Sequence, residues 1–459
     1  MRVASFASFA ASATTTTKPS TATRIHIGSC SDTEEFQPMW STLRRRRGDA
    51  FFWGGDIVYG DRFSPEVERL PATYRAAQEL LGALRPTPAN ASMLQALYGK
   101  QKRESGYAAY AASLAVVDGI WDDHDFGVDN AHGGTLDGAT KDAHKAALLD
   151  FLDVAPDDAR RAPGRGIFAA RRVGDVDVVL LDGRYYREER GGALLGQAQW
   201  AWLEDHLAAA RPWATATVIV SPTQVLASAD RPRPAEGWFE YPAERQRLFE
   251  ALARHNATAF LVSGDVHFAE LSAYACEGGG RRRAVAELTT SGLSHAWGSR
   301  DPAFYDSRAL HRFKHFAMVV HQFILRRFVW TYQLPGGRYH LGLNAGELDV
   351  DAEAGTLVAR ALDHRGRVAL ERTWALEELH VGALGAGPLA CAPAAARASR
   401  GRGAALGFAA TYAVVAAPVV LYLALTLALA YRVLRCVWAT LSPDRLSRAR
   451  SLSDLVFLV

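Results

Sequence analysis

Short apolar runs alternate with longer amphipathic stretches from Arg24 onward, and this alternation limits the possible folds more than any other feature of the chain. The runs are continuously apolar rather than alternating with polar residues, which is typical of strands covered on both faces of a sheet. They are 24–29, 50–55, 114–121, 175–182, 215–221, 258–264 and 284–290. Helix-like stretches such as 141–153, 197–210 and 242–255 lie between them. The pattern predicts an α/β architecture.

A different pattern closes this part of the chain. The segments 346–351, 356–362 and 367–374 are rich in strand-forming residues and are split by Glu353-Ala354-Gly355 and by His364-Arg365-Gly366. Short strands separated by turn residues predict an antiparallel meander. We therefore place one domain over residues 24–377.

The composition changes after residue 377. Residues 378–403 are rich in Ala, Gly, Pro and Arg, which is typical of a linker. Residues 404–431 contain no charged side chain and exceed the roughly 20 apolar residues that a membrane-spanning helix needs. A buried helix of a soluble domain is the alternative, but soluble helices of this length keep a polar face. We predict a transmembrane helix over 404–431, followed by a short basic tail over 432–459.

The arginines around this segment predict its orientation. Arg432, Arg435, Arg445, Arg448 and Arg450 follow it, whereas Arg397, Arg400 and Arg402 precede it. The slight excess after the segment favours a cytoplasmic C-terminus. The domain over 24–377 is then expected in the lumen or outside the cell. The glycosylation sequons that begin at Asn90 and Asn256 agree with this side.

The N-terminal segment and the composition add few constraints. Residues 1–23 are rich in Ser, Thr and Ala and are interpreted as a disordered tail or a weak targeting segment. The net charge of +3, with scattered arginines, predicts no nucleic-acid partner. The four cysteines have neither CxxC spacing nor a pattern from which disulfides can be assigned.

Polar clusters follow several of the predicted strands. In open α/β sheets, ligands bind beyond the carboxyl ends of the strands. Each cluster alone has an ordinary structural explanation, because Asp is common at helix N-caps and turns and a single Cys is usually a small hydrophobe. Their recurrence favours a shared site. The clusters are Gly28-Ser29-Cys30, Gly54-Gly55-Asp56 with Tyr59, Trp121-Asp122-Asp123-His124-Asp125, Leu181-Asp182-Gly183-Arg184 and Ser263-Gly264-Asp265-Val266-His267.

The residue types in these clusters suit metal ions. Asp265 and His267 can face one ion if the backbone between them is extended, and Asp56 and Tyr59 share a side if a helical turn begins there. A phenolate and the Cys30 thiolate favour a trivalent or soft transition ion, whereas carboxylates suit Ca, Mg or Mn. Two metals held close together can clamp a phosphoryl group and generate hydroxide at neutral pH.

An ordered set of motifs resembles the PhoD-type alkaline phosphatases, which belong to the calcineurin-like metallophosphoesterases. Singly each motif is weak, but the whole set occurs here in the order of that family, over roughly residues 24–377. The motifs are Gly28–Cys30, Gly55–Tyr59, Trp121–Asp125, Leu181–Arg187, Glu244–Phe249 and Ser263–Glu270, with Thr290–His295 as a further block.

The resemblance implies a four-layered αββα sandwich and the metal-dependent hydrolysis of phosphate monoesters or diesters by a metal-activated hydroxide. It implies a ferric ion, Fe³⁺, held by a Cys and a Tyr, with Ca²⁺ ions nearby; other divalent metals are possible. His124 is expected to bind phosphate and protonate the leaving oxygen. Arg184 is either a phosphate clamp or the partner of Asp182 in a structural ion pair. The implied metal ligands are Cys30, Asp56, Tyr59, Asp123, Asp265 and His267.

Two alternatives are weighed against this function. A serine hydrolase is a poor one, because Gly292-Leu293-Ser294-His295-Ala296 lacks the second glycine of a nucleophile elbow. The stronger one is a membrane-tethered binding or scaffold module with an inactive phosphatase fold. Since every expected ligand position is occupied, we predict an active enzyme that acts on a small-molecule phosphate ester. Its preference for monoesters or diesters is expected to depend on loops such as 126–140 and 227–241.

Overall fold

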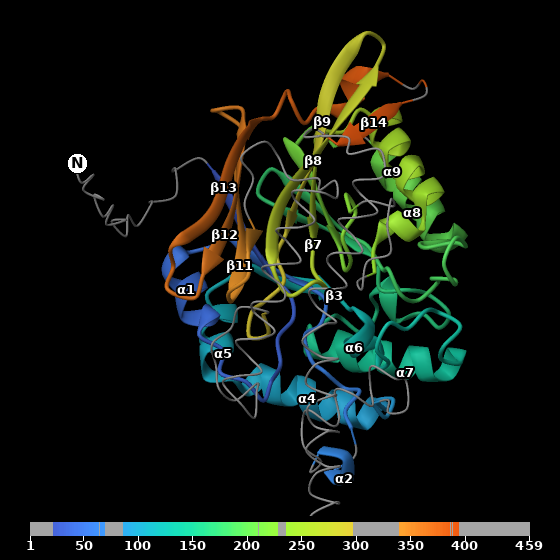
Figure 1. The fold of residues 1–459 in the computed structure, drawn as a ribbon, viewed down its shortest axis with the longest axis vertical. Helices are drawn as coiled ribbons and strands as arrows, with labels where there is room; N and C mark the ends of the chain where they lie inside the picture. The colour runs from blue at the N-terminus through green and yellow to red at the C-terminus, as the bar shows by residue number, and fades with distance from the viewer. Residues whose placement is uncertain are drawn as a thin grey trace, which may run out of the picture. The chain divides into compact units, whose positions relative to one another are not determined.

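The computed structural model describes residues 22–63, 65–68, 86–209, 211–227, 236–296, 339–385, 387 and 389–393. These residues form a mixed α/β domain with two β-sheets (Figure 1). The α/β class predicted from the alternation of apolar runs and amphipathic stretches is therefore confirmed.

The first sheet has six strands in the order β13-β12-β11-β1-β2-β3. β1, β2 and β3 are parallel, and β1 also pairs with β11 in antiparallel fashion, with Ile25 opposite Leu348. This pairing joins the start of the domain to the meander near its end. The strands are β1 Thr23–Gly28, β2 Ala50–Gly54, β3 Val116–Ile120, β11 Asn344–Asp351, β12 Thr356–Asp363 and β13 Val368–Ala375.

The second sheet has eight strands, in the order β10-β8-β9-β7-β6-β5-β4 with β14 also paired to β8. β5, β6, β7 and β9 are parallel, and antiparallel strands flank them on both sides. The strands are β4 Ala169–Val173, β5 Val176–Leu180, β6 Ala216–Ser221, β7 Ala259–Ser263, β8 Ala269–Gly278, β9 Arg281–Thr289, β10 Tyr339–His340 and β14 Ala390–Pro393.

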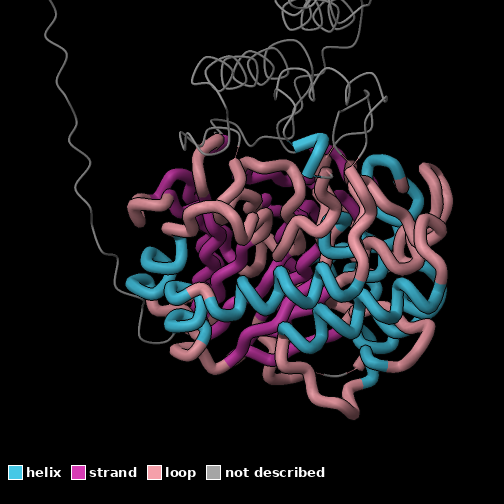
Figure 2. The backbone as a smooth tube through the Cα atoms, turned by 90° about the horizontal axis from the view of Figure 1, so that it is seen from below, coloured by secondary structure: helices cyan, strands magenta, loops and turns pink. Residues whose placement is uncertain are grey.

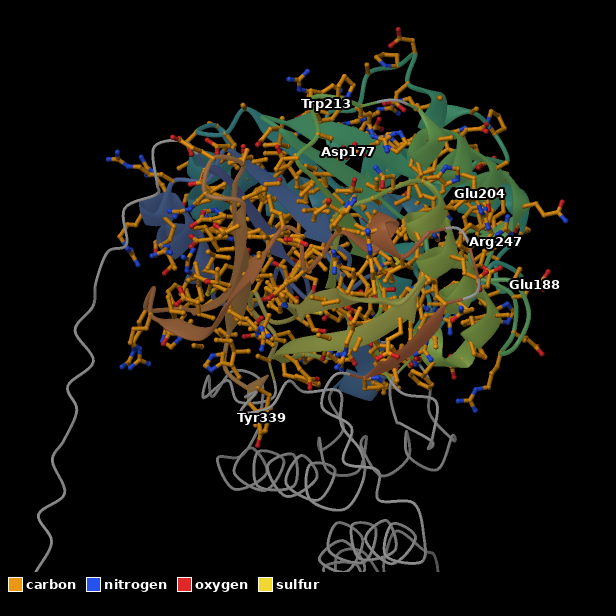
Figure 3. The ribbon with its side chains drawn as sticks, turned by 90° about the horizontal axis from the view of Figure 1, so that it is seen from above. Asp177, Glu188, Glu204, Trp213, Arg247 and Tyr339 are labelled. Atoms are coloured by element: carbon orange, nitrogen blue, oxygen red, sulfur yellow. A yellow bond between two sulfur atoms is a disulfide. The ribbon has the colours of Figure 1, made fainter. Side chains whose placement is uncertain are left out.

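Helices flank the strands (Figure 2). α4 packs on α7 and α1 packs on α5, while α8 packs on α9, where Arg247 lies 3.0 Å from Glu204 at the surface (Figure 3). The helices are α1 Met39–Arg46, α2 Pro65–Glu68, α4 Ala91–Arg103, α5 Ser105–Ala111, α6 Asp123–Phe126, α7 Gly138–Phe151, α8 Gly196–Ala208 and α9 Pro242–Arg254. Short 3₁₀ turns occupy Ala159–Arg161, Trp238–Glu240 and Val381–Leu384.

One hydrophobic core takes side chains from both sheets. Val178 and Leu180 of β5 belong to it together with β1 residues, and Val179 between them is buried outside it. Because side chains alternate along a strand, β5 is covered on both faces, as its continuous apolar run predicts. The rings of Phe260 in β7 and Trp374 in β13 lie 5.3 Å apart, so the two sheets contact each other directly.

Most elements predicted from apolar runs and turn residues are confirmed. The strands β1, β2, β3, β5, β6, β7 and β9, the helices α7, α8 and α9, and the β11–β13 meander lie within a few residues of the predicted ranges. The pattern missed β8, because the buried polar residues Glu270 and Ser272 interrupt the apolar signal of Ala269, Leu271 and Ala273, which face the core. It also missed the short or edge strands β4, β10 and β14.

Part of the predicted linker is folded. Residues 381–384 form a 3₁₀ turn, and β14 pairs with β8. Val381 and Leu384 are buried, and such isolated apolar residues are hard to recognise among Ala, Gly and Pro. The predicted segments 404–431 and 432–459, and nearly all of 1–23, lie outside the described residues. Within the part of the chain that the structure describes, no helix has the length and apolar character that crossing a bilayer requires.

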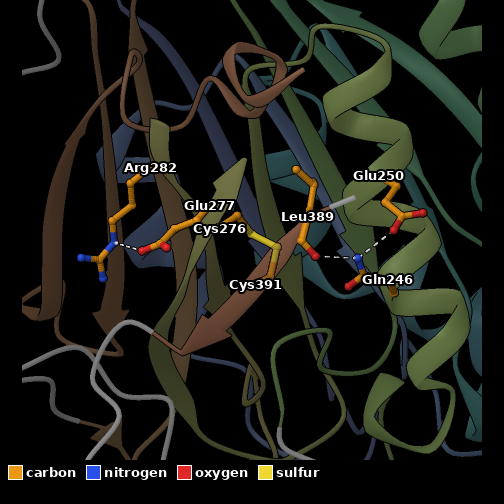
Figure 4. The surroundings of a disulfide bond; sticks show 7 residues. All are labelled: Gln246, Glu250, Cys276, Glu277, Arg282, Leu389 and Cys391. Atoms are coloured by element: carbon orange, nitrogen blue, oxygen red, sulfur yellow. Dashed lines mark hydrogen bonds and ion pairs between the residues drawn. A yellow bond between two sulfur atoms is a disulfide. The ribbon is translucent and has the colours of Figure 1, made fainter. Parts of the chain in front are cut away.

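A disulfide that the cysteine spacing did not reveal joins Cys276 of β8 to Cys391 of β14 (Figure 4). The two residues are Cα partners in the sheet although 115 positions separate them in the sequence. Gln246 of α9 adds a second attachment by donating a hydrogen bond to the Leu389 carbonyl, 3.1 Å away. The disulfide thus fixes β14, a strand that has little apolar surface of its own to bury.

A buried charge network links β1, α1 and the meander. The carboxylate of Glu347, which is fully buried, pairs with Arg46 and with Arg360, 3.0 Å away. Arg360 also lies 2.6 Å from Asp349, whose carboxylate accepts two hydrogen bonds from Arg24. Burial by itself would raise the pKa of Glu347, but the hydrogen bond from Arg46 and that of His26 hold it well below its ordinary value. Each buried charge here has an opposite partner.

Replacing Glu347 with Gln should destabilise the domain by about 3 kcal/mol at neutral pH, because it removes the carboxylate that offsets the charges of two buried guanidinium groups, those of Arg46 and Arg360. Since the folded-state pKa of Glu347 is depressed, its contribution is present above the unfolded pKa and is lost as the pH falls. The deficit of the variant should therefore shrink in acid, as urea unfolding at neutral and acidic pH would measure. The control is Glu371→Gln, whose half-exposed side chain also pairs with Arg360 and should cost less than about 1 kcal/mol. Equal losses for both variants would contradict this account.

Candidate metal centre

The loops that follow β1, β2 and β7 carry polar residues in a left-handed backbone conformation. The φ angle is 59° at Cys30, 50° at Asp56, 73° at Asp265 and 57° at His267. Such angles are uncommon in residues other than glycine, and they gather at functional sites. Gly55 has a φ of 99°, and a Cβ there would lie 2.6 Å from the Cβ of Asp122. The glycine thus allows the β2 loop to approach the loop that follows β3.

Cys30, Asp56 and Tyr59 lie together, as predicted. The Cys30 Sγ atom is 3.6 Å from Oδ2 of Asp56, and the Tyr59 hydroxyl is 3.4 Å from the same oxygen. Two backbone hydrogen bonds hold the loops in register, from Cys30 N to Gly55 O and from Ser31 N to Asp56 O. All three side chains are buried or nearly so. A thiol, a carboxyl and a phenol thus converge on one point.

Asp123 connects two groups of potential metal ligands. Asp56, Asp123 and His124 offer ligand atoms that all lie within 4.8 Å of one another, and so do Asp122, Asp123 and Asp265. Of these residues, sequence reasoning predicted Asp56, Asp123 and Asp265 as ligands and His124 as a catalytic group. The structure adds Asp122 to the potential ligands predicted from the sequence. It precedes α6, so both neighbouring acids of the Trp121–Asp125 motif contribute to the site.

His267 lies near Tyr59 but belongs to neither of the two ligand groups. Its ring lies 6.5 Å from that of Tyr59 and stacks on the ring of His295 at 4.2 Å. The Ser291 hydroxyl accepts a 2.6 Å hydrogen bond from the His267 backbone and lies 2.9 Å from Cys30 Sγ. Ser291 and His295 had no predicted role. Both belong to the Thr290–His295 motif, which was the available signal.

His124 is oriented by a carboxylate from another loop. Its Nδ1 atom lies 2.6 Å from Oδ1 of Asp61, whose other oxygen accepts a 2.7 Å hydrogen bond from the Asp129 backbone. Its ring lies 4.3 Å from the ring of Tyr59. Burial lowers the pKa of His124, but Asp123 and the bond to Asp61 outweigh it and raise the pKa to about 10. Nδ1 is thus engaged by Asp61, and Nε2 lies 4.0 Å from the Asp129 carboxylate.

Arg184 is fully buried, and its partners differ from the one predicted. Its guanidinium lies 2.5 Å from Asp122 and 2.6 Å from Glu236, and it donates a 2.9 Å hydrogen bond to the Ala131 carbonyl. The ion pair with Asp182, one of the two predicted alternatives, is not formed; Asp182 accepts instead from the Arg184 backbone and from the Trp121 indole. The role of Arg184 as a phosphate clamp stays a prediction.

The electrostatics of the cluster suit bound cations. Burial and neighbouring carboxylates raise the pKa values of Asp56 and Asp265 well above the ordinary range. Burial raises the pKa of the Cys30 thiol to about 12. The Oδ1 atom of Asp56 is buried and accepts no hydrogen bond from the residues that the structure describes. A metal ion would satisfy that oxygen and offset the buried negative charge, so the donor set fits a metal centre.

Comparisons with known proteins reveal similarities to a protein family and to solved structures. The sequence profile of the PhoD-like phosphatase family matches residues 25–321. A solved structure titled "Structure of PhoD" superposes with a TM-score of 0.53 at 15% identity and covers 82% of this chain and 73% of its own. A second, "GAP50 the anchor in the inner membrane complex of Plasmodium", has a TM-score of only 0.41 at 10% identity and covers 77% and 88%. No curated protein sequence matches the chain.

Replacing Asp56 with Asn should have opposite effects on the metal-free and metal-loaded protein. In the metal-free protein the variant should be more stable by about 1–3 kcal/mol, because it removes a buried carboxylate with an unsatisfied oxygen. Added iron should raise the melting temperature of the unmodified protein but hardly that of the variant. Thermal unfolding of chelator-treated protein, before and after the metal is added back, would measure both effects.

The control for this experiment is Asp153→Asn, which makes the same chemical change at an exposed residue paired with Lys102. This variant should have the same melting temperature as the unmodified protein in both the metal-free and the metal-loaded state. If Asp56→Asn destabilised the metal-free protein and kept the full metal-induced shift, Asp56 would not be a ligand.

Proposed function

The chain belongs to the PhoD-like phosphatase family, and from this premise we propose that it hydrolyses phosphate esters at the metal centre around Asp123. The observation that carries the proposal is the joining of two ligand groups through Asp123, inside the family match over residues 25–321. A pair of adjacent cation sites suits phosphoryl transfer, because two metal ions can stabilise both the attacking and the leaving oxygen.

We propose a ferric ion beside Cys30, Asp56 and Tyr59, and calcium beside the Asp122–Asp123–Asp265 group. The choice follows ligand chemistry, since a thiolate and a phenolate suit a trivalent or soft ion and carboxylates suit calcium. Bound metal ions would polarise the phosphoryl oxygens and supply a nucleophile from water at neutral pH. Elemental analysis of the purified protein tests the choice, and a protein that holds neither ion would refute it.

His124 is proposed as the general acid. Asp61 occupies its Nδ1 atom, so Nε2 is the atom that would face the substrate. A water molecule that has lost a proton to the solvent forms the new bond to phosphorus while the bond to the leaving oxygen breaks, and the leaving oxygen receives a proton from Nε2. Its side chain is 19% exposed, which gives a substrate access that the buried acids lack.

Replacing His124 with Asn should lower kcat for p-nitrophenyl phosphate and its bis-ester by about 10²–10⁴-fold, the usual contribution of a positioned acid. His255→Asn is the control, because His255 ends α9 and belongs to no ligand group. His124 has a ligand atom close to those of Asp56 and Asp123, so metal content separates the two roles: if His124 is the acid and not a ligand, both variants bind as much metal as the unmodified protein. If metal-loaded, folded wild-type protein hydrolysed neither ester, the alternative of a binding or scaffold module would replace this proposal.

We further propose that the catalytic domain lies in the lumen or outside the cell, anchored through residues 404–431. The Cys276–Cys391 disulfide supports an oxidising compartment, where such bonds persist. Asn90 and Asn256 of the two sequons are both exposed, as glycosylation requires.

Carbonate extraction would test the anchor. The full chain should stay with the membrane pellet, whereas a version that ends near residue 395 should be released, because only the former contains 404–431. Membranes from cells that express each version, probed with the same antibody, provide the comparison. Equal release of the two versions would contradict the anchor, and a free-thiol assay that finds Cys276 and Cys391 reduced in the cell would contradict the compartment.

A further inference from the structure

The carboxylate of Glu236 bridges two arginines at the edge of the metal centre. One oxygen lies 2.6 Å from Nη1 of Arg184 and the other lies 2.7 Å from Nη2 of Arg187. The side chain of Glu236 is 11% exposed, and those of the two arginines are 0% and 7% exposed. Two guanidinium groups that share one anion in this way resemble the arrangement by which proteins bind phosphate.

Glu236 is separated from the ligand groups by a single guanidinium. The same Arg184 that it contacts lies 3.5 Å from Oδ1 of Asp123, the residue common to both groups. The negative charge of Glu236 therefore lies close to the place where a phosphate ester would react.

The position of this carboxylate is fixed by the buried residues that follow it. Trp238 donates a 3.0 Å backbone hydrogen bond to the Gln224 carbonyl, and its indole donates to the Ser221 hydroxyl. The Tyr241 hydroxyl accepts from Arg187 Nε at 2.9 Å and donates to the Glu188 carbonyl at 2.7 Å. Both aromatic side chains are buried. Glu236 is thus held in place on the arginine pair by the 3₁₀ turn and its anchors.

We propose that Glu236 determines the charge of the ester that the enzyme prefers, favouring phosphodiesters, which carry one negative charge, over phosphomonoesters, which carry nearly two. The inference rests on the proposed phosphoesterase function. A phosphate monoester bears about −1.5 to −2 at neutral pH, because its second pKa is near 6. Repulsion by a fixed carboxylate grows with the charge of the ligand, so Glu236 penalises the monoester more.

The test compares two esters with the same leaving group. For metal-loaded full-length protein, the ratio of kcat/KM for bis-p-nitrophenyl phosphate to that for p-nitrophenyl phosphate is measured before and after Glu236→Gln. The variant should shift the ratio toward the monoester by about tenfold, which corresponds to about 1.4 kcal/mol. An unchanged ratio, or a shift toward the diester, would overturn the inference.

Two controls separate this role from a structural one. Glu240→Gln removes the same charge from a residue that contacts Arg187 at 3.2 Å and Arg190 but not Arg184, so it should leave the ratio unchanged. Glu236→Asp keeps the charge and should leave the ratio within about threefold of the original. Equal shifts in Glu240→Gln and Glu236→Gln would show a general charge effect and overturn the inference.

A binding measurement keeps the inference testable without catalysis. Calorimetric titration of the full-length protein with inorganic phosphate and with dimethyl phosphate gives the ratio of two dissociation constants, and Glu236→Gln should shift that ratio about tenfold toward phosphate. If neither ester is hydrolysed but this shift occurs, the proposed function fails and the charge preference stands. If Glu236→Gln does not fold, the unmodified protein decides, since a preference for p-nitrophenyl phosphate over its bis-ester would contradict the inference.

Discussion

The structure depends on concentrating buried carboxylates at the ends of parallel strands. Asp56 follows β2, Asp122 and Asp123 follow β3, and Asp265 follows β7, and all but Asp265 are almost fully buried by the side chains around them. Like charges so close together oppose folding unless cations offset them. Arg184 offsets part of this charge through its contact with Asp122. The remainder fits a metal centre better than a structural ion network.

The network around Glu347 is also buried and polar, but its charges are balanced. Around Glu347, each buried acid faces a guanidinium, and the pKa of Glu347 is depressed. Around Asp56, burial and neighbouring acids raise the pKa, and one carboxylate oxygen has no hydrogen-bond donor among the described residues. Both clusters are buried and polar, so burial alone does not distinguish them. The balance of charge does, because a balanced network needs no ligand.

Local patterns predicted what local interactions decide. The apolar runs located β1, β2 and β7, and the motifs after them supplied Cys30, Asp56 and Asp265, because strand ends and their loops are encoded by adjacent residues. Contacts between distant segments were not predictable in this way. The Cys276–Cys391 bond spans 115 positions, and Arg184 contacts Glu236 rather than the neighbouring Asp182. His295 was recognisable as part of a motif, but only the fold places its ring against His267.

The central claim is that Cys30, Asp56 and Tyr59 hold a metal ion beside Asp123. An anomalous difference map, from crystals of the protein measured above the iron absorption edge, tests it most directly because it locates the ion as well as detecting it. The account predicts a strong peak between the Cys30 Sγ atom, the Asp56 carboxylate and the Tyr59 hydroxyl. A map with no peak at that place, from crystals grown with iron and calcium present, would contradict it.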